Sequence, residues 1–406
     1  MVAEIGGSAK ADQAGRVVAL LSGPDRAAVS GVSTHLNLLF NSRLAQRCTL
    51  AHFKAGSEGR GESRLGRVAR LLASPFALLA SIVRHRAHIL HLNSGLTARA
   101  YWRDLAYLVV AKLCGARVVY QIHGGALPQR FFGGNRLLTA FLRMTLQWPD
   151  AIVVLASVEL EAFRSFVPRQ RVVMLPNAID CAPFAALRRS FGTADQPLRL
   201  LYIGRLAREK GLHETLQALR HLRGQGVKAH LTIAGGGPEE AHLRRFVREL
   251  GIDDEVTFAG PVFGEAKVRL LGEVDVFILA SYAEGLPYAL LESMAAGVPC
   301  IVTRVGAVPD VVSERVHGLF VPPRDALAIS QAISLLAGNR RTLALMSAAC
   351  RERVMSGYGI DRLALELAAL YGSVCGQERD EGAKGAKGAK GAEGEKGAPI
   401  GGAPHV

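Results

Sequence analysis

Two carboxylates stand eight residues apart in the segment AEGLPYALLESMAAGVPCIV, which begins at Ala283. Glu284 lies in the loop after the apolar run DVFILAS, and Glu292 lies in a run with helical periodicity, for which Pro287 is a favourable first residue. No basic residue stands beside Glu292 in the sequence, and a carboxylate among leucines is costly to bury without hydrogen-bond donors. The vicinal hydroxyls of a sugar or a ribose supply such donors, so we expect both carboxylates to bind a polyhydroxylated ligand.

Two cations follow another apolar run, LRLLYIG. Arg205 comes directly after this run, and Lys210 lies five residues further on, just before a helix expected from about Gly211. Cations in a strand-to-helix loop are suited to hold a diphosphate. An isolated pair with this spacing is usually only exposed in a loop, and the carboxylates that follow strengthen the diphosphate interpretation. In the first half, Gly31 precedes a helix expected from about Val32, whose N–H groups could face the same anion.

These side chains need parallel sheets to bring them together. From Val17 the chain alternates short β-branched runs with longer amphipathic segments, and a second series of the same kind begins at LRLLYIG, after a weakly patterned stretch at 181–197. Such alternation predicts βαβ units, and so two doubly wound α/β domains. Ligands of open parallel sheets bind beyond the carboxyl ends of the strands. We therefore expect the site in the cleft between the two domains.

The positive charge is confined to the first half of the 406-residue chain. Residues 1–190 hold 24 Lys and Arg against 10 Asp and Glu, whereas the remainder holds 25 of each sign, so the whole net charge of +14 belongs to the first half. This asymmetry indicates an anionic partner such as acidic lipid, a lipid phosphate, an anionic glycan or nucleic acid. The alternative is a solvated arginine-rich surface.

Cysteine spacing and hydropathy suggest a compartment. The six cysteines are scattered without a C-x-x-C pair, which argues against a disulfide framework and a zinc site and favours a reducing cytoplasm. The N-terminus lacks an apolar core of signal-peptide length, and LLASPFALLASIV, between Arg70 and Arg84, predicts an amphipathic or core helix rather than a span. For His85, His88 and His91 we predict core or surface positions and no metal, while His91 and Asn93 could line an acceptor cleft.

The C-terminal segment differs in kind from the rest. Glycine recurs at every third position from Gly382 through Gly397, but six triplets without proline are too few for a stable triple helix. We expect a disordered collagen-like tail at 377–406, the alternative being a trimerising or partner-binding segment. A disordered N-terminus is expected at 1–14.

Several motifs in order resemble the retaining glycosyltransferases of the GT-B fold, in the family called GT4. They are MLPNAID, YIGRLAREKG, the E-x7-E pattern from Glu284 to Glu292, and RVGAVPDVV. The resemblance covers about residues 15–375 and implies two Rossmann-like domains facing across a cleft. The N-terminal, acceptor-binding domain is expected at 15–190 and the nucleotide-sugar domain at 191–357, with a helix at 358–376 packing back towards the first domain.

The resemblance also implies roles for individual residues. Arg205 and Lys210 would bind the diphosphate and stabilise it as leaving group in place of a metal, and Glu284 would lie by the transferred sugar as a third catalytic residue. Glu292 would accept hydrogen bonds from the ribose. The resemblance further implies that Gly31 approaches the diphosphate and that His123 contacts the sugar. The backbone at Gly285 and Leu286 would contact the sugar or the phosphate.

The chain departs from the family pattern at two glycine positions and has no metal-binding D-x-D motif. The family often has two glycines where Ser30 and Gly31 stand, and many members have paired glycines where this chain has Gly306 and Ala307. The nearest acidic pair, Glu273 and Asp275, falls at a strand start away from the expected cleft. We therefore expect no metal and no cofactor, with a nucleotide-diphosphate sugar as co-substrate.

The resulting prediction is a cytoplasmic retaining hexosyltransferase (EC 2.4 class) of cell-surface polysaccharide or glycoconjugate synthesis. It would transfer a hexosyl unit from a UDP- or GDP-linked sugar to a glycan or lipid-linked acceptor. The basic N-terminal half could contact the inner membrane face peripherally, and no nucleic acid is expected as partner. The alternatives are a nucleotide-sugar epimerase of GT-B architecture and a non-catalytic protein that binds anions or membranes.

Overall fold

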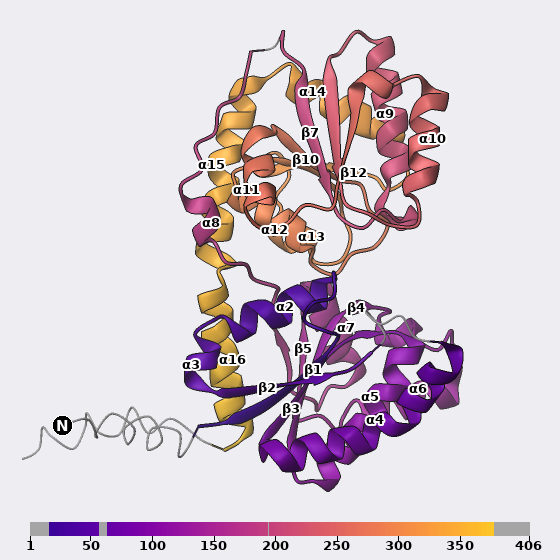
Figure 1. The fold of residues 1–406 in the computed structure, drawn as a ribbon, viewed down its shortest axis with the longest axis vertical. Helices are drawn as coiled ribbons and strands as arrows, with labels where there is room; N and C mark the ends of the chain where they lie inside the picture. Colours follow the sequence, from indigo (N-terminus) through magenta and orange to yellow (C-terminus); the bar gives the residue numbers. More distant parts are fainter. Residues whose placement is uncertain (1–15, 57–62, 194, 377–406) are drawn as a thin grey trace, which may run out of the picture.

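The computed structural model describes residues 16–56, 63–193 and 195–376. The predicted disordered segments at 1–14 and 377–406 lie outside the described residues. Two parallel sheets of six strands, each with helices packed on it, form a lower and an upper domain (Figure 1). This arrangement confirms the predicted α/β class with two doubly wound sheets. All six cysteines fall in the described part and are free thiols, so none of them forms a disulfide.

The lower sheet has the strand order β2-β1-β3-β4-β5-β6. Its central strands are apolar and buried along most of their length, as expected for parallel strands covered on both faces. The strands are β1 (Val18–Gly23), β2 (Thr49–Lys54), β3 (Ile89–Leu96), β4 (Arg117–Gly125), β5 (Ala151–Val154) and β6 (Val172–Met174). The helices are α2 (Gly31–Phe40), α3 (Leu44–Arg47), α4 (Arg64–His85), α5 (Ala98–Leu113), α6 (Arg136–Thr145) and α7 (Ser157–Phe166).

The upper sheet has the order β12-β11-β10-β7-β8-β9. In both domains the strand order reverses beside the first strand of the series, β1 or β7, which creates the crevice where such sheets bind ligands. The strands are β7 (Leu198–Ile203), β8 (Ala229–Ala234), β9 (Val256–Gly260), β10 (Val276–Leu279), β11 (Cys300–Thr303) and β12 (Gly318–Val321). The helices are α8 (Ala182–Ala185), α9 (Leu212–Gly224), α10 (Glu240–Leu250), α11 (Gly264–Glu273), α12 (Tyr288–Ala295), α13 (Val308–Val311), α14 (Ala326–Ala337) and α15 (Arg340–Gly357).

The chain crosses between the domains twice, and the two crossings are hydrogen-bonded to each other. The N–H of Ile179 donates to the carbonyl of Tyr358 at 2.9 Å, and the N–H of Ile360 donates to the carbonyl of Ile179 at 2.9 Å. Phe184 in α8 already packs in the upper core, so the first crossing lies near Ile179, before the expected limit at residue 190. After the second crossing, α16 (Ile360–Val374) returns to the lower domain, where Tyr371 is fully buried (Figure 1).

Helix α4 exposes more apolar surface than a core helix would. Ser63 caps its N-terminus, and it buries Leu78 and Ile82 against the lower domain, but a row of large apolar side chains faces outward. It is the one helix in the described part that is long and apolar enough to cross a membrane by length and composition, and 17% of the apolar window is buried. The exposed members of the row are Leu65, Val68, Leu71, Leu72, Phe76, Leu79 and Val83.

Candidate active site

Loops at the carboxyl edges of the two sheets meet between the domains. Gly285, after β10, lies so near the end of β4 that a Cβ atom added to it would stand 3.2 Å from the carbonyl oxygen of His123. A Cβ atom on Gly124 would stand 3.6 Å from the Cα atom of Gly285. The predicted residues His123 and Gly285, which are far apart in the sequence, are therefore neighbours across the interface.

Lys210 and Glu284 form an ion pair on the upper edge. The Lys210 ammonium lies 2.7 Å from the Glu284 carboxylate, and the two side chains are only 19% and 10% exposed. Lys210 ends a short turn before α9, and Gly211 follows with φ +69°, where a side chain would collide with the carbonyl of Ala280. The glycine thus lets the lysine loop lie against the end of β10, beside the glutamate loop.

Arg205 lies on the same edge but at its exposed side. Its guanidinium pairs with Glu209 at 2.7 Å, with 68% of the arginine side chain exposed. The backbone around Arg205 is held by the glycine run after β8, because a Cβ on Gly235 would fall on the carbonyl of Gly204 and one on Gly237 on that of Leu206. An exposed pair of this kind contributes little stability, so Arg205 can exchange Glu209 for a phosphate at small cost.

Glu292 has a basic partner, which corrects the sequence-based expectation that only a ligand would satisfy it. Lys267 of α11 lies 2.5 Å from the Glu292 carboxylate in the second turn of α12, and both side chains are largely buried. Burial raises the pKa of Glu292, while Lys267 opposes that shift. The carboxylate and the ammonium satisfy each other, and a second carboxylate oxygen remains for a ligand's hydroxyls.

Two residues without a predicted role position the glutamate loop. Asn177, in the motif MLPNAID, donates its side-chain amide to the carbonyl of Leu286 at 2.8 Å, so that carbonyl is held from the lower domain. Gly306 has φ +53° and packs on the carbonyls of Glu284 and Gly285, where any side chain would clash. The motifs were visible in the sequence, but the contact that each one makes was not.

Gly31 begins α2 on the lower side of the interface, opposite the start of α12. A Cβ atom on Gly31 would stand 3.9 Å from the ring of Tyr288. The Tyr288 hydroxyl in turn lies 3.1 Å from Nδ1 of His35, one turn further along α2. This Tyr288–His35 contact joins the domains directly, and no sequence pattern predicted it because the two residues are 253 positions apart.

His123 belongs to a group of uncharged polar side chains at the end of β4. Its Nε2 atom lies 3.1 Å from the side-chain oxygen of Asn93, and its ring meets that of His35 edge-on with centroids 4.7 Å apart. Burial lowers the pKa of His123 well below its usual value and that of His35 to about 4. Both imidazoles are therefore neutral at pH 7. His91, by contrast, is fully buried against Tyr371 and, unlike Asn93, does not line the cavity that begins at His123.

A cavity of about 720 Å³ leads from His123 and Asn93 outward between α4 and α5. The described residues of its wall include no acidic side chain, while arginines and apolar groups alternate there. The basic members are Arg67, Arg70, Arg99 and Arg103, and the large apolar members are Leu71, Leu72, Pro75 and Trp102. An amphipathic anion fits such a wall better than a neutral polar molecule does.

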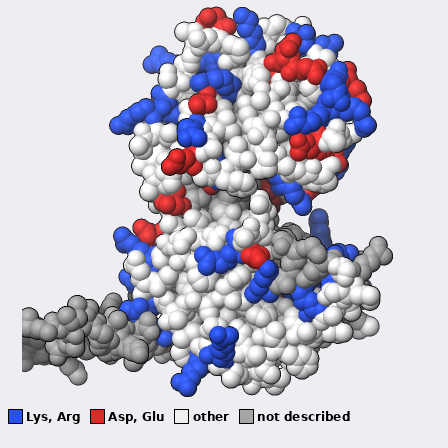
Figure 2. Space-filling model, viewed as in Figure 1, with Lys and Arg blue, Asp and Glu red and all other residues white. Residues whose placement is uncertain are grey.

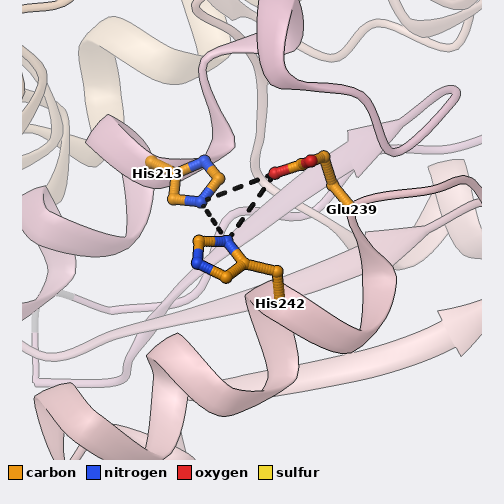
Figure 3. A group of neighbouring side chains, drawn as sticks. All are labelled: His213, Glu239 and His242. Atoms are coloured by element: carbon orange, nitrogen blue, oxygen red, sulfur yellow. Dashed lines mark hydrogen bonds and ion pairs between the residues drawn. The ribbon is translucent and has the colours of Figure 1, made fainter.

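Asp275, one of the two acidic residues considered for a D-x-D motif, serves the fold. Asp275 is buried and pairs with Arg199 at 2.7 Å and with Arg340 at 3.5 Å. Elsewhere in the described residues, one group of side chains has the composition and spacing of a metal site, namely His213, Glu239 and His242 (Figure 3). It lies at the starts of α9 and α10, three residues after Lys210, and the expectation of a metal-free transfer remains a prediction.

Two family models match adjacent parts of the chain. The model described as "Glycosyltransferase Family 4" matches residues 54–182, and "Glycosyl transferases group 1" matches residues 184–353. Among curated relatives, a GDP-mannose-dependent alpha-(1-6)-phosphatidylinositol monomannoside mannosyltransferase of Mycobacterium tuberculosis is 31% identical over 274 residues, 64% of this chain and 70% of the relative. The chain belongs to the family of GT4 group 1 glycosyltransferases, as its motifs predicted.

Other relatives match over a shorter part. The putative colanic acid biosynthesis glycosyltransferase WcaL of Escherichia coli is 30% identical over 210 residues, 50% of this chain and 51% of the relative. The chain thus spans about half the length of this curated relative. Solved structures confirm the two-domain GT-B fold. Sucrose-phosphate synthase from Thermosynechococcus elongatus has a TM-score of 0.74 at 19% identity, covering 89% of this chain and all of that one. The structure of Anabaena HepE in complex with UDP-glucose has a TM-score of 0.69 at 15% identity, and the match covers 88% of this chain and all of that one.

Proposed function

We propose that the protein is a retaining glycosyltransferase that moves a hexosyl unit from a nucleotide-diphosphate sugar to a lipid-linked or glycan acceptor, without a metal ion. The observation that carries this proposal is the Lys210–Glu284 ion pair next to Gly285, which meets the end of β4 at His123 across the interface. Family membership supports the transferase class. The names of the relatives support the donor class, because one uses GDP-mannose and the structure of another holds UDP-glucose.

The charged residues suit a leaving group that gains negative charge. The bond from the anomeric carbon to the diphosphate breaks while the bond to the acceptor oxygen forms on the same face, and the acceptor proton passes to a diphosphate oxygen. Lys210 and Arg205 stabilise that diphosphate, which displaces their present partners Glu284 and Glu209. Preorganised cations at such a position contribute several kcal/mol to catalysis. Glu284, once released, accepts hydrogen bonds from the sugar.

The arginine-lined cavity is the proposed acceptor site. It ends at His123 and Asn93, next to the proposed position of the sugar, and its wall combines arginines with apolar side chains. A phosphate carried on a lipid presents both an anion and an apolar chain, which matches that wall. The neutral imidazole of His123 can accept or donate a hydrogen bond there without attracting the diphosphate away from Lys210.

Features on the same side of the molecule support a peripheral position at the inner membrane face. The outward row of leucines, valines and Phe76 on α4 adjoins the cavity, and α4 carries arginines but no acidic residue. Figure 2 shows basic side chains with few acidic ones over the lower domain on this face, and both signs mixed over the upper domain. An amphipathic basic helix of this kind binds anionic lipid surfaces.

The donor is the first point to test. Calorimetric titration of the chain with UDP, GDP and ADP, and then with their sugars, should show one nucleotide bound at least about 10-fold more tightly than the others. Release of free nucleoside diphosphate only in the presence of an acceptor distinguishes a transferase from an epimerase. Absence of binding by every nucleotide tested would remove the basis of the proposal.

A further inference from the structure

Three side chains of the upper domain that have no role in the proposed donor site converge at the starts of α9 and α10. His213 is the second residue of α9, Glu239 is the N-cap residue of α10, and His242 follows in the first turn of α10. Figure 3 shows the two imidazoles and the carboxylate turned towards one common space between the two helices. The three potential ligand atoms all lie within 4.8 Å of one another.

The spacing of these atoms matches a metal coordination sphere. Nε2 of His213 lies 2.9 Å from Nδ1 of His242, and one oxygen of Glu239 lies 3.8 Å from the first nitrogen and 3.7 Å from the second. A point equidistant from three atoms with these separations lies about 2.0 Å from each, which is the length of Zn–N and Zn–O bonds. This point lies in the plane of the three atoms, so a tetrahedral ion with a fourth ligand requires shifts of about half an ångström in the ligand atoms, which side-chain rotation can supply.

Hydrogen bonds account for only part of this arrangement. The two imidazole nitrogens can share one proton at 2.9 Å, but the Glu239 oxygen is too far from either nitrogen for a hydrogen bond. The carboxylate therefore faces both rings without a hydrogen bond to either of them. A divalent cation between them would give all three groups a partner at once.

The backbone holds these ligands in place. The N–H of Glu239 donates to the carbonyl of Leu206 at 3.1 Å, and Gly237 packs on the same carbonyl where a side chain would clash. His213 follows Gly211 closely, is 6% exposed, and its ring packs beside that of Phe246 with centroids 5.4 Å apart. Both ligand-bearing helix ends are thus fixed on the edge of the sheet, and little ordering would accompany binding of an ion.

We propose that His213, Glu239 and His242 bind one Zn²⁺ ion, which links the N-termini of α9 and α10. Two imidazoles and a carboxylate form a ligand set that zinc accepts, and the exposed sides of His242 and Glu239 leave the fourth position to water. The ion would tie the turn containing Lys210 to the glycine run after β8. This role is structural and does not depend on the proposed transfer chemistry.

The test measures zinc binding by the untagged full-length chain after treatment with a chelator. Equilibrium dialysis with metal analysis should give one Zn²⁺ per chain, and His213→Gln, Glu239→Gln or His242→Gln should each weaken binding at least about 10-fold. His221→Gln, on the exposed part of α9, and Glu240→Gln, beside Glu239, are the matched controls and should bind as the unaltered chain does. Nucleotide is absent throughout, so failure here leaves the proposed function unaffected.

Two further readouts guard against a variant that merely folds poorly. Zn²⁺ should raise the melting temperature of the unaltered chain and of His221→Gln but not of His242→Gln. Co²⁺ should give the intense visible absorption of a four-coordinate ion in the unaltered chain and lose it in His242→Gln. Equal zinc affinity in the unaltered chain and His242→Gln, or no stoichiometric zinc in either, would overturn the proposal.

Discussion

The two sheet edges that meet between the domains use different chemistry. The upper edge presents charged side chains in pairs, Lys210 with Glu284 and Lys267 with Glu292. The lower edge presents neutral groups, above all His35 and His123, whose pKa values burial lowers. The upper edge can therefore balance a change in the charge of a ligand, whereas the neutral groups of the lower edge can orient a ligand and exclude water.

The difference in charge between the two edges suggests a separate role for each domain. In the proposed transfer, the diphosphate gains negative charge and needs cations nearby, which the upper edge offers in Lys210 and Arg205. The acceptor hydroxyl needs a hydrogen-bond partner that does not compete for the diphosphate, and a neutral imidazole meets that need. Charge on the lower domain lies instead in the arginines of the cavity, where a lipid phosphate would bind.

The largest expected effect comes from removing the charge at the upper edge. Lys210→Met should lower kcat about 10²- to 10³-fold, because the leaving diphosphate loses its buried cation. The variant also leaves Glu284 without its partner, so Lys210→Met/Glu284→Gln serves as the control for folding. Both proteins should melt cooperatively, and transfer rates with the identified donor provide the measurement. Normal turnover by Lys210→Met would contradict the role assigned to the ion pair.

The two glutamates should differ in which kinetic constant they control. Glu284→Gln should lower kcat up to about 100-fold without weakening nucleotide binding, because Glu284 is assigned to the sugar and competes with the diphosphate for Lys210. Glu292→Gln should weaken nucleotide binding about 10-fold, since it removes an ionised acceptor for the ribose hydroxyls. Calorimetry with the nucleoside diphosphate, alongside steady-state rates, separates the two. If both variants lose nucleotide affinity equally, the separate assignments are wrong.

The sequence predicted which segments carry the site better than it predicted how they pair. Alternating runs gave both sheets, and the motifs placed Lys210, Glu284 and His123 on loops that the structure brings to one interface. The partner of Glu292 was missed because Lys267 lies on another helix, 25 residues away, and adjacency in the sequence says nothing about such contacts. The Tyr288–His35 contact was missed for the same reason, since it depends on how two separately folded domains meet.

The neutral edge should make the lower domain sensitive to acid. His35 packs on His123 and contacts Tyr288, and its folded-state pKa of about 4 lies below the usual 6.5, so the unfolded chain binds more protons between these values. Stability is therefore lost as the pH falls below 6.5. From pH 7 to pH 5 this histidine alone should lower the free energy of unfolding by about 2 kcal/mol.

The two tryptophans make this acid effect measurable in one domain. Trp102 and Trp148, the only tryptophans of the chain, both belong to the lower domain, so urea unfolding followed by tryptophan fluorescence reports that domain alone. His35→Gln should remove about 2 kcal/mol of the difference in unfolding free energy between pH 7 and pH 5. An undiminished pH dependence in the variant would show that His35 titrates freely in the folded state.

The smallest expected effect concerns vesicle binding by the exposed apolar row of α4, because the surfaces of the two domains also differ in charge. Phe76 and Leu72 are 74% and 70% exposed on α4 of the basic domain, and Leu345 is 68% exposed on α15 of the domain without net charge. In flotation with anionic vesicles, Phe76→Ser should reduce binding about 10-fold, since a buried aromatic side chain contributes about 1.5–3 kcal/mol. Leu345→Ser is the matched control and should float as the unaltered chain does. Because arginines adjoin the apolar row, vesicle binding should also weaken with added salt. If neither added salt nor Phe76→Ser reduces the bound fraction, α4 is not the membrane contact.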